Sequence, residues 1–241
     1  MANCTIYPVP MQMTVHDKSV LTYRFNFGQA FAGTMYAWLI DCGKEKILVD
    51  AGVSTEYTRN VRKMWAYPLQ TLDEGLGKLG VAFGDIDIVL FTQLHHDHTA
   101  YASRIPRARM VVQQKELDFA RNPHPAFAEG YNWKFIEDVK FDIISGDAKI
   151  NDDVSVFFTP GHTPGGQSVS VKTSQGNTVI AGLCACRDNF SPPPNYPLPV
   201  ITPGIHTSTL DAYDSCIKIK EMADFIIPIH DPEFLEKRSI S

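Results

Sequence analysis

The chain has 241 residues, of which 44% are hydrophobic and 20% are charged, and its formal net charge at pH 7 is −5. This composition is typical of a globular protein, and with no linker in the sequence we expect one α/β domain over residues 1–241. The net negative charge and the absence of a stripe of Lys and Arg argue against nucleic-acid binding. No apolar run is long enough to cross a membrane.

The first half of the chain alternates strand-like and helix-like segments. Residues 35–52 predict a hairpin of two apolar strands around a glycine-containing turn. Residues 54–65 and 71–81 have the patterning of two helices. Residues 85–93 predict a buried strand that runs into a cluster of His and Asp, and residues 108–122 predict a strand followed by a helix.

The second half repeats this alternation. Residues 154–161 predict a strand, and residues 167–185 predict a second hairpin. Residues 191–204 contain six prolines, which forbid regular structure and favour an ordered surface loop or lid. Residues 207–223 predict an amphipathic helix, and residues 224–232 predict a last strand.

Potential metal ligands follow strands in both halves. His95, Asp97 and His98 lie in a loop directly after a predicted strand, His162 follows another, and the last strand carries His230. Histidine is the commonest ligand for zinc-like ions, and aspartate adds a harder oxygen donor. We therefore expect a sheet-on-sheet sandwich with outer helices and a site at one edge.

The chain resembles the metallo-β-lactamase superfamily, and within it the branch of the N-acyl-homoserine lactonases. The resemblance rests on LVDAG (48–52), FTQLHHDH (91–98), TPGHTPGG (159–166), AGLC (181–184) and IPIHDP (227–232). It covers nearly the whole length. It implies an αββα sandwich of two mixed β-sheets with outer helices, and metal ions bound at the sheet edge.

The resemblance also implies a role for individual residues. A first ion would take position 93, His95 and His162, and a second would take Asp97, His98 and His230. Asp50 would orient one of the ligand imidazoles. The expected cofactor is one or two divalent metal ions, zinc first, with manganese or iron as alternatives.

Two positions depart from the pattern of the family. Gln93 stands where the family has the first histidine, and alignment places Leu183 where the family has an aspartate that bridges both ions. Gln93 either coordinates weakly through its carbonyl oxygen or only hydrogen-bonds the bound water. Cys184 and His206 are candidate substitutes: Cys184 as a thiolate near the metal, and His206 as a ligand or a catalytic acid/base.

These features predict a metallohydrolase that opens a small-molecule lactone, ester or amide. A metal-bound hydroxide would attack the carbonyl, and Asp97 would hold the water and pass its proton to the leaving group. A mononuclear iron oxidoreductase on the same fold and a degenerate binding protein without catalysis are the alternatives.

Other residues receive ordinary roles. His16, His96 and His124 are expected to be solvated or capping side chains. Aromatic residues of three loops are candidate walls of a small, partly apolar substrate pocket: Phe25, Phe27, Phe31, Trp65, Tyr67, Phe190 and Tyr196.

Five scattered cysteines, an odd number, predict a reduced cytoplasmic protein. The N-terminus does not resemble a signal peptide. We expect a homodimer on the base rate of oligomers alone.

Overall fold

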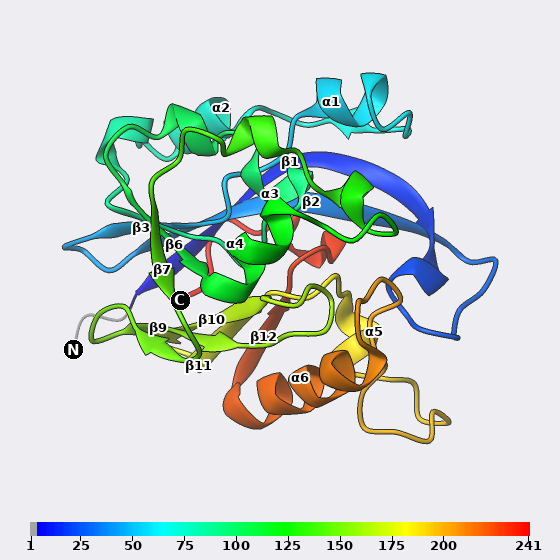
Figure 1. Cartoon of the computed structure of the whole chain (residues 1–241). Helices are drawn as coiled ribbons and strands as arrows, with labels where there is room; N and C mark the ends of the chain where they lie inside the picture. Colours follow the sequence, from blue (N-terminus) through cyan, green and yellow to red (C-terminus); the bar gives the residue numbers. More distant parts are fainter. Residues whose placement is uncertain (1–3) are drawn as a thin grey trace.

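Two β-sheets pack face to face, and helices cover both outer surfaces (Figure 1). The computed structural model describes residues 4–241. The strands of the first sheet are β1 (Thr5–Asp17), β2 (Ala30–Asp41), β3 (Lys46–Val49), β4 (Tyr67–Pro68), β5 (Ile88–Leu90), β6 (Arg109–Gln113) and β7 (Phe141–Ile144). Those of the second are β8 (Ala148–Lys149), β9 (Val154–Phe158), β10 (Gln167–Thr173), β11 (Gly176–Ala181) and β12 (Phe225–Pro228). The α-helices are α1 (Thr55–Asn60), α2 (Leu72–Lys78), α3 (His96–Thr99), α4 (Gln114–Arg121), α5 (Arg187–Phe190) and α6 (Thr209–Met222).

Both sheets are mixed. The strand order of the first is β4-β1-β2-β3-β5-β6-β7, and that of the second is β12-β11-β10-β9-β8. In the first sheet β3, β5, β6 and β7 run parallel, and in the second β11 and β12 run parallel. This arrangement confirms the predicted αββα sandwich. The carboxyl ends of β3 and β5 therefore lie side by side at one edge, where ligands bind in parallel sheets.

The core lies in three layers. Trp38 and Ile40 of β2 face the second sheet, where they belong to the same cluster as Val156 and Val169. Leu39, between them in the sequence, belongs instead to the cluster beneath α2 and α4. Because successive side chains of a strand point to opposite faces, a strand covered on both sides is apolar throughout. A third cluster packs α6 on the outer face of the second sheet.

The helices begin where capping side chains predict. Ser54 accepts a hydrogen bond from the backbone N–H of Tyr57 at the start of α1, and Ser208 caps α6 in the same way.

The predicted helix over 54–65 is wrong in its second half, because α1 ends at Asn60. Lys63 has φ +54°, which is incompatible with a continuing helix.

Strand β1 has no counterpart among the predicted elements. It spans 13 residues and pairs along its length with β2. Pro8 and Pro10 conceal it in the sequence, since proline is normally excluded from strand interiors. On the other side β1 pairs with β4 only at Gln12 and Met13, so most of it is an edge strand, where proline is tolerated.

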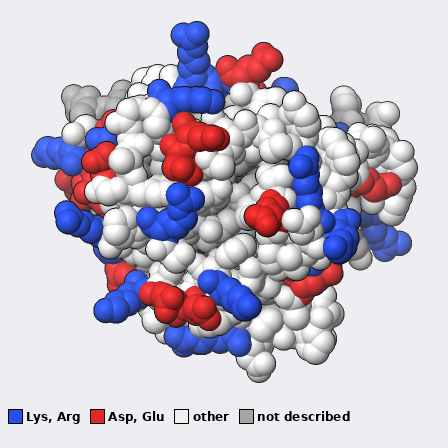
Figure 2. Space-filling model, turned by 90° about the horizontal axis from the view of Figure 1, so that it is seen from above, with Lys and Arg blue, Asp and Glu red and all other residues white. Residues whose placement is uncertain are grey.

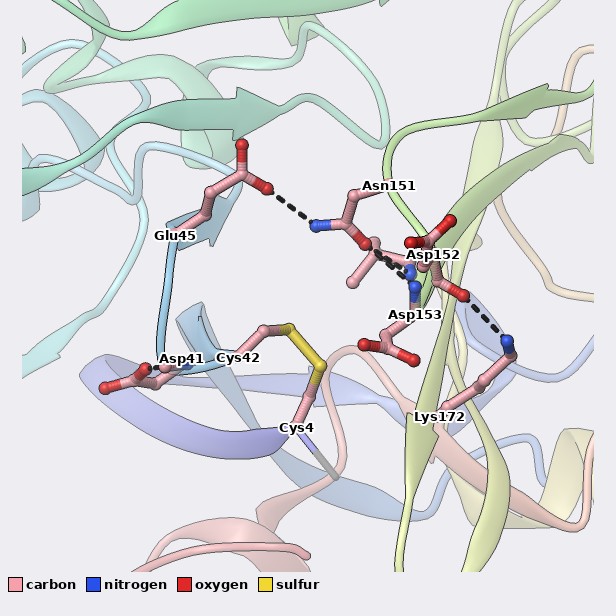
Figure 3. Close-up of a disulfide and its surroundings, with 10 residues drawn as sticks. Cys4, Asp41, Cys42, Glu45, Asn151, Asp152, Asp153 and Lys172 are labelled. Atoms are coloured by element: carbon pink, nitrogen blue, oxygen red, sulfur yellow. Dashed lines mark hydrogen bonds between the residues drawn. A yellow bond between two sulfur atoms is a disulfide. The ribbon is translucent and has the colours of Figure 1, made fainter. Parts of the chain in front are cut away.

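A disulfide joins Cys4 to Cys42 (Figure 3). The antiparallel register pairs Thr5 with Asp41, which brings the two cysteines that flank this pair to a Cα separation of 4.3 Å. The prediction of reduced cysteines is therefore wrong for this pair. Since disulfides are rare in reducing compartments, the cysteine-based argument for a cytoplasmic location no longer holds.

Basic side chains are scattered among acidic ones on the face that Figure 2 shows, without a continuous patch of one sign. In residues 4–241 no helix has the length and apolarity needed to cross a membrane.

Candidate metal centre

The cluster predicted for a loop spans the end of the loop after β5 and the four-residue helix α3, which contains Asp97 and His98. His95 occupies the N-cap position of α3, and His98 lies in its last turn. Asp50 follows β3 directly, with φ +61°. Because β3 and β5 are parallel neighbours, Asp50 and the loop meet at the same sheet edge.

Asp97, His98 and His230 converge. Each offers a ligand atom, and these atoms all lie within 4.8 Å of one another. Asp97 Oδ2 is 3.5 Å from His98 Nε2 and 4.0 Å from His230 Nε2. Across residues 4–241 no other three His, Cys, Asp or Glu side chains form such a group.

Hydrogen bonds on their far sides hold both imidazoles in place. His98 Nδ1 lies 2.7 Å from Asp50 Oδ2, and His230 Nδ1 lies 3.4 Å from the Thr34 carbonyl oxygen. Asp50 is fully buried and accepts further hydrogen bonds from the backbone N–H and hydroxyl of Thr92. With Nδ1 bonded on the far side, Nε2 of each ring points to the centre of the group, which is the orientation that a metal-ligating histidine requires.

Burial and charge act differently on the three histidines nearest the centre. Burial lowers the pKa of His162 to about 4 and that of His230 to about 3, so both imidazoles are neutral at pH 7. Burial lowers the pKa of His98 too, but the carboxylates of Asp97 and Asp50 outweigh it and raise that pKa to about 9. Burial raises the pKa of Asp97. The surrounding imidazoles, His98 first, lower it by a larger amount, so the pKa lies well below its usual range.

Gln93, His95 and His162, the ligands implied for the other ion, also come together. Gln93 is 1% exposed, and its Nε2 lies 3.0 Å from His98 Nε2 and 2.9 Å from His162 Nε2. The His95 ring packs against that of His162 at 5.0 Å between centroids. The amide nitrogen of Gln93 thus lies between two imidazoles.

The end of β11 supplies no carboxylate. Leu183, which the predicted register places at the position of the bridging aspartate, is fully buried in the apolar cluster beneath α6. The following residue, Cys184, lines the cavity instead, and burial raises the pKa of its thiol. Asp188, the next carboxylate along the chain, forms an ion pair with Lys18 at 2.6 Å.

His206 does not line the cavity. Its Nδ1 lies 2.7 Å from the Pro203 carbonyl oxygen, and its Nε2 lies 2.7 Å from the Thr209 hydroxyl. Its ring packs against Tyr23. Because both ring nitrogens have local partners, this geometry favours a structural role.

The cavity beside the centre has a volume of about 310 Å³, and its walls differ from those predicted. Of the seven aromatic candidates none lines it, since several point to solvent: Phe27 is 71% exposed and Trp65 62%. Gln12, Thr14 and His16, alternate residues of β1, form one wall. His16 and His96 were expected to be solvated or capping side chains. This expectation is incomplete, because both side chains line the cavity.

Glu116 is a supporting residue that the sequence pattern did not reveal. It is fully buried in α4, its Oε1 accepts from the Leu94 N–H at 2.9 Å, and its Oε2 accepts from the Gly165 N–H at 3.2 Å. Its carboxylate therefore ties the loop of His95 to the loop of His162. A glutamate in an amphipathic helix carries no local signal of such a contact.

Gly130 is a second supporting position. A Cβ atom there would lie 2.7 Å from His95 Cδ2, so glycine lets this backbone approach the imidazole. Tyr131 packs its ring against His95 on the same side, with 4.6 Å between centroids.

The donor set of Asp97, His98 and His230 fits a divalent metal ion. It comprises one carboxylate and two imidazoles whose Nε2 atoms point toward it, and this set suits zinc, manganese or iron(II). Enclosure in a small cavity leaves room for a substrate beside it.

A profile of the metallo-beta-lactamase superfamily matches residues 32–223, and the chain belongs to this superfamily. N-acyl homoserine lactonase AttM of Azorhizobium caulinodans is 27% identical over 225 residues, with 81% of each chain covered. An N-acyl homoserine lactonase of Bacillus thuringiensis is 23% identical over 198 residues, with 77% of this chain and 78% of the relative covered.

Solved structures show the same fold. An N-acyl homoserine lactone hydrolase with the product N-hexanoyl-L-homoserine bound at its catalytic metal centre has a TM-score of 0.79 at 21% identity, covering 97% of this chain and 95% of that one. AidC, described as a dizinc quorum-quenching lactonase, has a TM-score of 0.71 at 18% identity, covering 98% and 88%. These structures confirm the predicted fold, and the family profile confirms the predicted membership of the metallo-beta-lactamase superfamily.

Proposed function

We propose that this protein is a metal-dependent hydrolase that opens a small lactone, ester or amide. The observation that carries the proposal is the group of Asp97, His98 and His230 beside a cavity. Hydrogen bonds to Nδ1 fix the orientation of both imidazoles. A divalent ion bound there would supply a Lewis acid that polarises a carbonyl and makes water nucleophilic near neutral pH. The names of the relatives support a cyclic ester as the substrate class.

The chain's own residues would orient the reactants. Asp97 lines the cavity as a carboxylate, so it can align an attacking water and move its proton toward the leaving group. Asp50 keeps the His98 ring in one tautomer and one orientation.

A polar residue in one cavity wall indicates that the substrate has a hydrogen-bond donor. Gln12 is 1% exposed and lines the cavity, and its Nε2 donates to the Thr58 hydroxyl at 3.2 Å. That hydroxyl itself donates to the Ser54 carbonyl oxygen, so it can only accept from Gln12. Gln12 Oε1 is thereby left as a buried acceptor without a partner among the described residues. We propose that a substrate N–H or O–H, away from the scissile bond, binds there.

Replacing this acceptor tests the substrate class. We expect Gln12→Leu to lower kcat/KM roughly tenfold or more for a lactone bearing an N–H, mainly by raising KM, because a lost buried hydrogen bond costs about 1–3 kcal/mol. A lactone without a donor group should be unaffected. Gln175→Leu, at an exposed turn and not among the residues that line the cavity, is the matched control. Equal losses for both substrates would refute the assignment.

Metal removal tests the reaction itself. Ring opening of N-hexanoyl-homoserine lactone, simple lactones and cyclic amides would be followed by proton release, before and after chelation and after return of zinc, manganese or iron. We expect activity to disappear with the metal and to return with it. Asp97→Asn should lower kcat at least about 100-fold, whereas Asp152→Asn, at an exposed carboxylate, should not.

Activity that survives complete removal of metal would refute the proposal. Oxygen uptake by the iron-loaded protein, without hydrolysis, would favour the oxidoreductase alternative. Metal binding without turnover of any of these substrates would favour a binding protein.

A further inference from the structure

Gln93 occupies the centre of the site. Its amide nitrogen lies 3.0 Å from His98 Nε2 and 2.9 Å from His162 Nε2, while its Oε1 is buried without a partner among the described residues. The side chain is almost completely enclosed. It therefore has one available arrangement, which the neighbouring imidazoles determine.

His162 decides which end of the amide faces it. Its Nδ1 lies 2.8 Å from the Ile205 carbonyl oxygen, which can only accept, so this nitrogen carries the proton that is donated. Nε2 of His162 must then be an acceptor, and only the NH₂ group of Gln93 can donate to it. The same NH₂ group lies 3.0 Å from His98 Nε2, but an ion bound at His98 also gains the Asp97 carboxylate and His230. At His162 the amide competes with an ion that gains no carboxylate, so the hydrogen bond to Gln93 persists there.

The segment after β11 supplies no carboxylate to lie between two ions. It consists of Leu183, which is fully buried in an apolar cluster, and Cys184, whose thiol side chain lines the cavity. Asp188, which could have contributed a carboxylate, is held by Lys18. Two dications in this cavity would repel each other without a bridging anion.

We propose that the chain binds one divalent ion, at Asp97, His98 and His230, and that the Gln93 amide, hydrogen-bonded to His162, replaces a second ion. The inference rests on the proposed metallohydrolase function and deepens it. His162 is then a positioning residue that holds Gln93 rather than a ligand. When an ion takes the lone pair of His98, the amide keeps its bond to His162.

Metal stoichiometry tests the inference. The full-length protein would be stripped, titrated with zinc in a calorimeter, and analysed by plasma mass spectrometry after gel filtration. We expect one tightly bound ion per chain. Cobalt(II), used as a spectroscopic substitute, should likewise saturate its visible absorption at one equivalent.

Variants distinguish the roles of the histidines. His230→Asn should abolish tight binding, whereas His162→Asn should leave one ion bound with its affinity changed less than about threefold. Gln93→His should take up a second ion, more weakly than the first, because three imidazoles then replace the amide arrangement while the bridging carboxylate is still absent. Gln93→Leu should not take up a second ion. If Gln93→His does not fold, the comparison of His162→Asn with His230→Asn still decides whether His162 is a metal ligand.

The outcomes separate this inference from the function. Two ions in the unmodified protein, or loss of one of two in His162→Asn, would overturn the inference and leave the metallohydrolase intact. No bound ion at all would overturn both.

Discussion

Asp50 shows how one residue sets the chemistry of the centre. Its backbone is in the left-handed region, which aspartate tolerates better than most residues, and its carboxylate reaches His98 at 2.7 Å. The same carboxylate accepts two hydrogen bonds from Thr92. Orientation of the His98 imidazole therefore depends on a fully buried group that never faces the cavity.

The role of Asp50 can be tested with a nearly isosteric change. We expect Asp50→Asn to weaken zinc affinity by about 10–100-fold, because an amide is a poorer acceptor and can turn its NH₂ toward His98. Competition with a chromophoric chelator measures this. Asp41→Asn, at the end of β2 near the disulfide, is the control. Unchanged affinity in Asp50→Asn would contradict the assigned role.

The neutral histidines predict acid sensitivity of the metal-free protein. His162 and His230 have pKa values of about 4 and 3 when folded, well below the ordinary value of 6.5. Below pH 6.5 the unfolded chain binds protons that the folded chain excludes, so the free energy of unfolding falls as the pH drops from about 6.5 to 4. Each imidazole contributes a slope of up to about 1.4 kcal/mol per pH unit.

Urea unfolding of the metal-free protein between pH 4 and 7 measures this slope. His162→Asn should have a smaller slope than the unmodified protein, since it removes one of the imidazoles that exclude a proton in the folded state. An identical slope in both proteins would show that other groups control acid stability.

At the scale of elements, α4 connects the two loops that carry the histidines. Glu116 accepts the N–H groups of Leu94 and Gly165 from those loops. A Cβ on Gly165 would lie 2.0 Å from the Glu116 backbone nitrogen, so the loop and the helix are in direct backbone contact. The relative position of His95 and His162 thus depends on this contact.

We expect Glu116→Gln to lower the free energy of unfolding by about 1–3 kcal/mol, because the NH₂ group of glutamine would face a backbone donor and leave it unsatisfied. Thermal unfolding of the metal-free protein measures the loss. Asp118→Asn, an exposed position on the same helix, should change it by less than about 0.5 kcal/mol. Equal stability of the two variants would exclude a connecting role for Glu116.

Most elements could be predicted from local patterns, and the exceptions have identifiable causes. The hairpins over 35–52 and 167–185 match β2–β3 and β10–β11 closely, because alternation and turn residues are local signals. Strand β1 was missed because its prolines are tolerated only at an edge, and a sequence does not state which strand is an edge. Because β1 was not predicted, the cavity wall formed by Gln12, Thr14 and His16 was not predicted either.

At the scale of the whole molecule, the disulfide joins the first strand to the β2–β3 hairpin across 38 residues of sequence. Figure 3 shows it beside the Glu45–Asn151 hydrogen bond, which links the two sheets. The chain-entropy estimate for a loop of this length is about 3–4 kcal/mol. We propose that the chain is one cooperative domain, and the cross-link then stabilises all of it.

The expected loss of stability follows directly. Replacing both cysteines, Cys4→Ser with Cys42→Ser, should lower the free energy of unfolding by about 3–4 kcal/mol and leave a single transition in urea. Zinc stoichiometry should not change, because the cysteines and the metal ligands lie in separate clusters. Two transitions would contradict the single domain, and an unchanged free energy would contradict the stabilising role.

The amino-acid sequence by itself determined the class of fold and the chemical types at the site. Alternation and helical periodicity, with histidines after strands, are local properties that predict a sandwich with a metal centre at its edge. Only the tertiary structure decided which donors converge and which are occupied by other bonds. Whether Gln93 meets His162, 69 residues away, and whether Cys184 rather than Leu183 faces the cavity, depend on how the two sheets and the loop strands pack. Such distances are set by the whole core, and no local pattern encodes them.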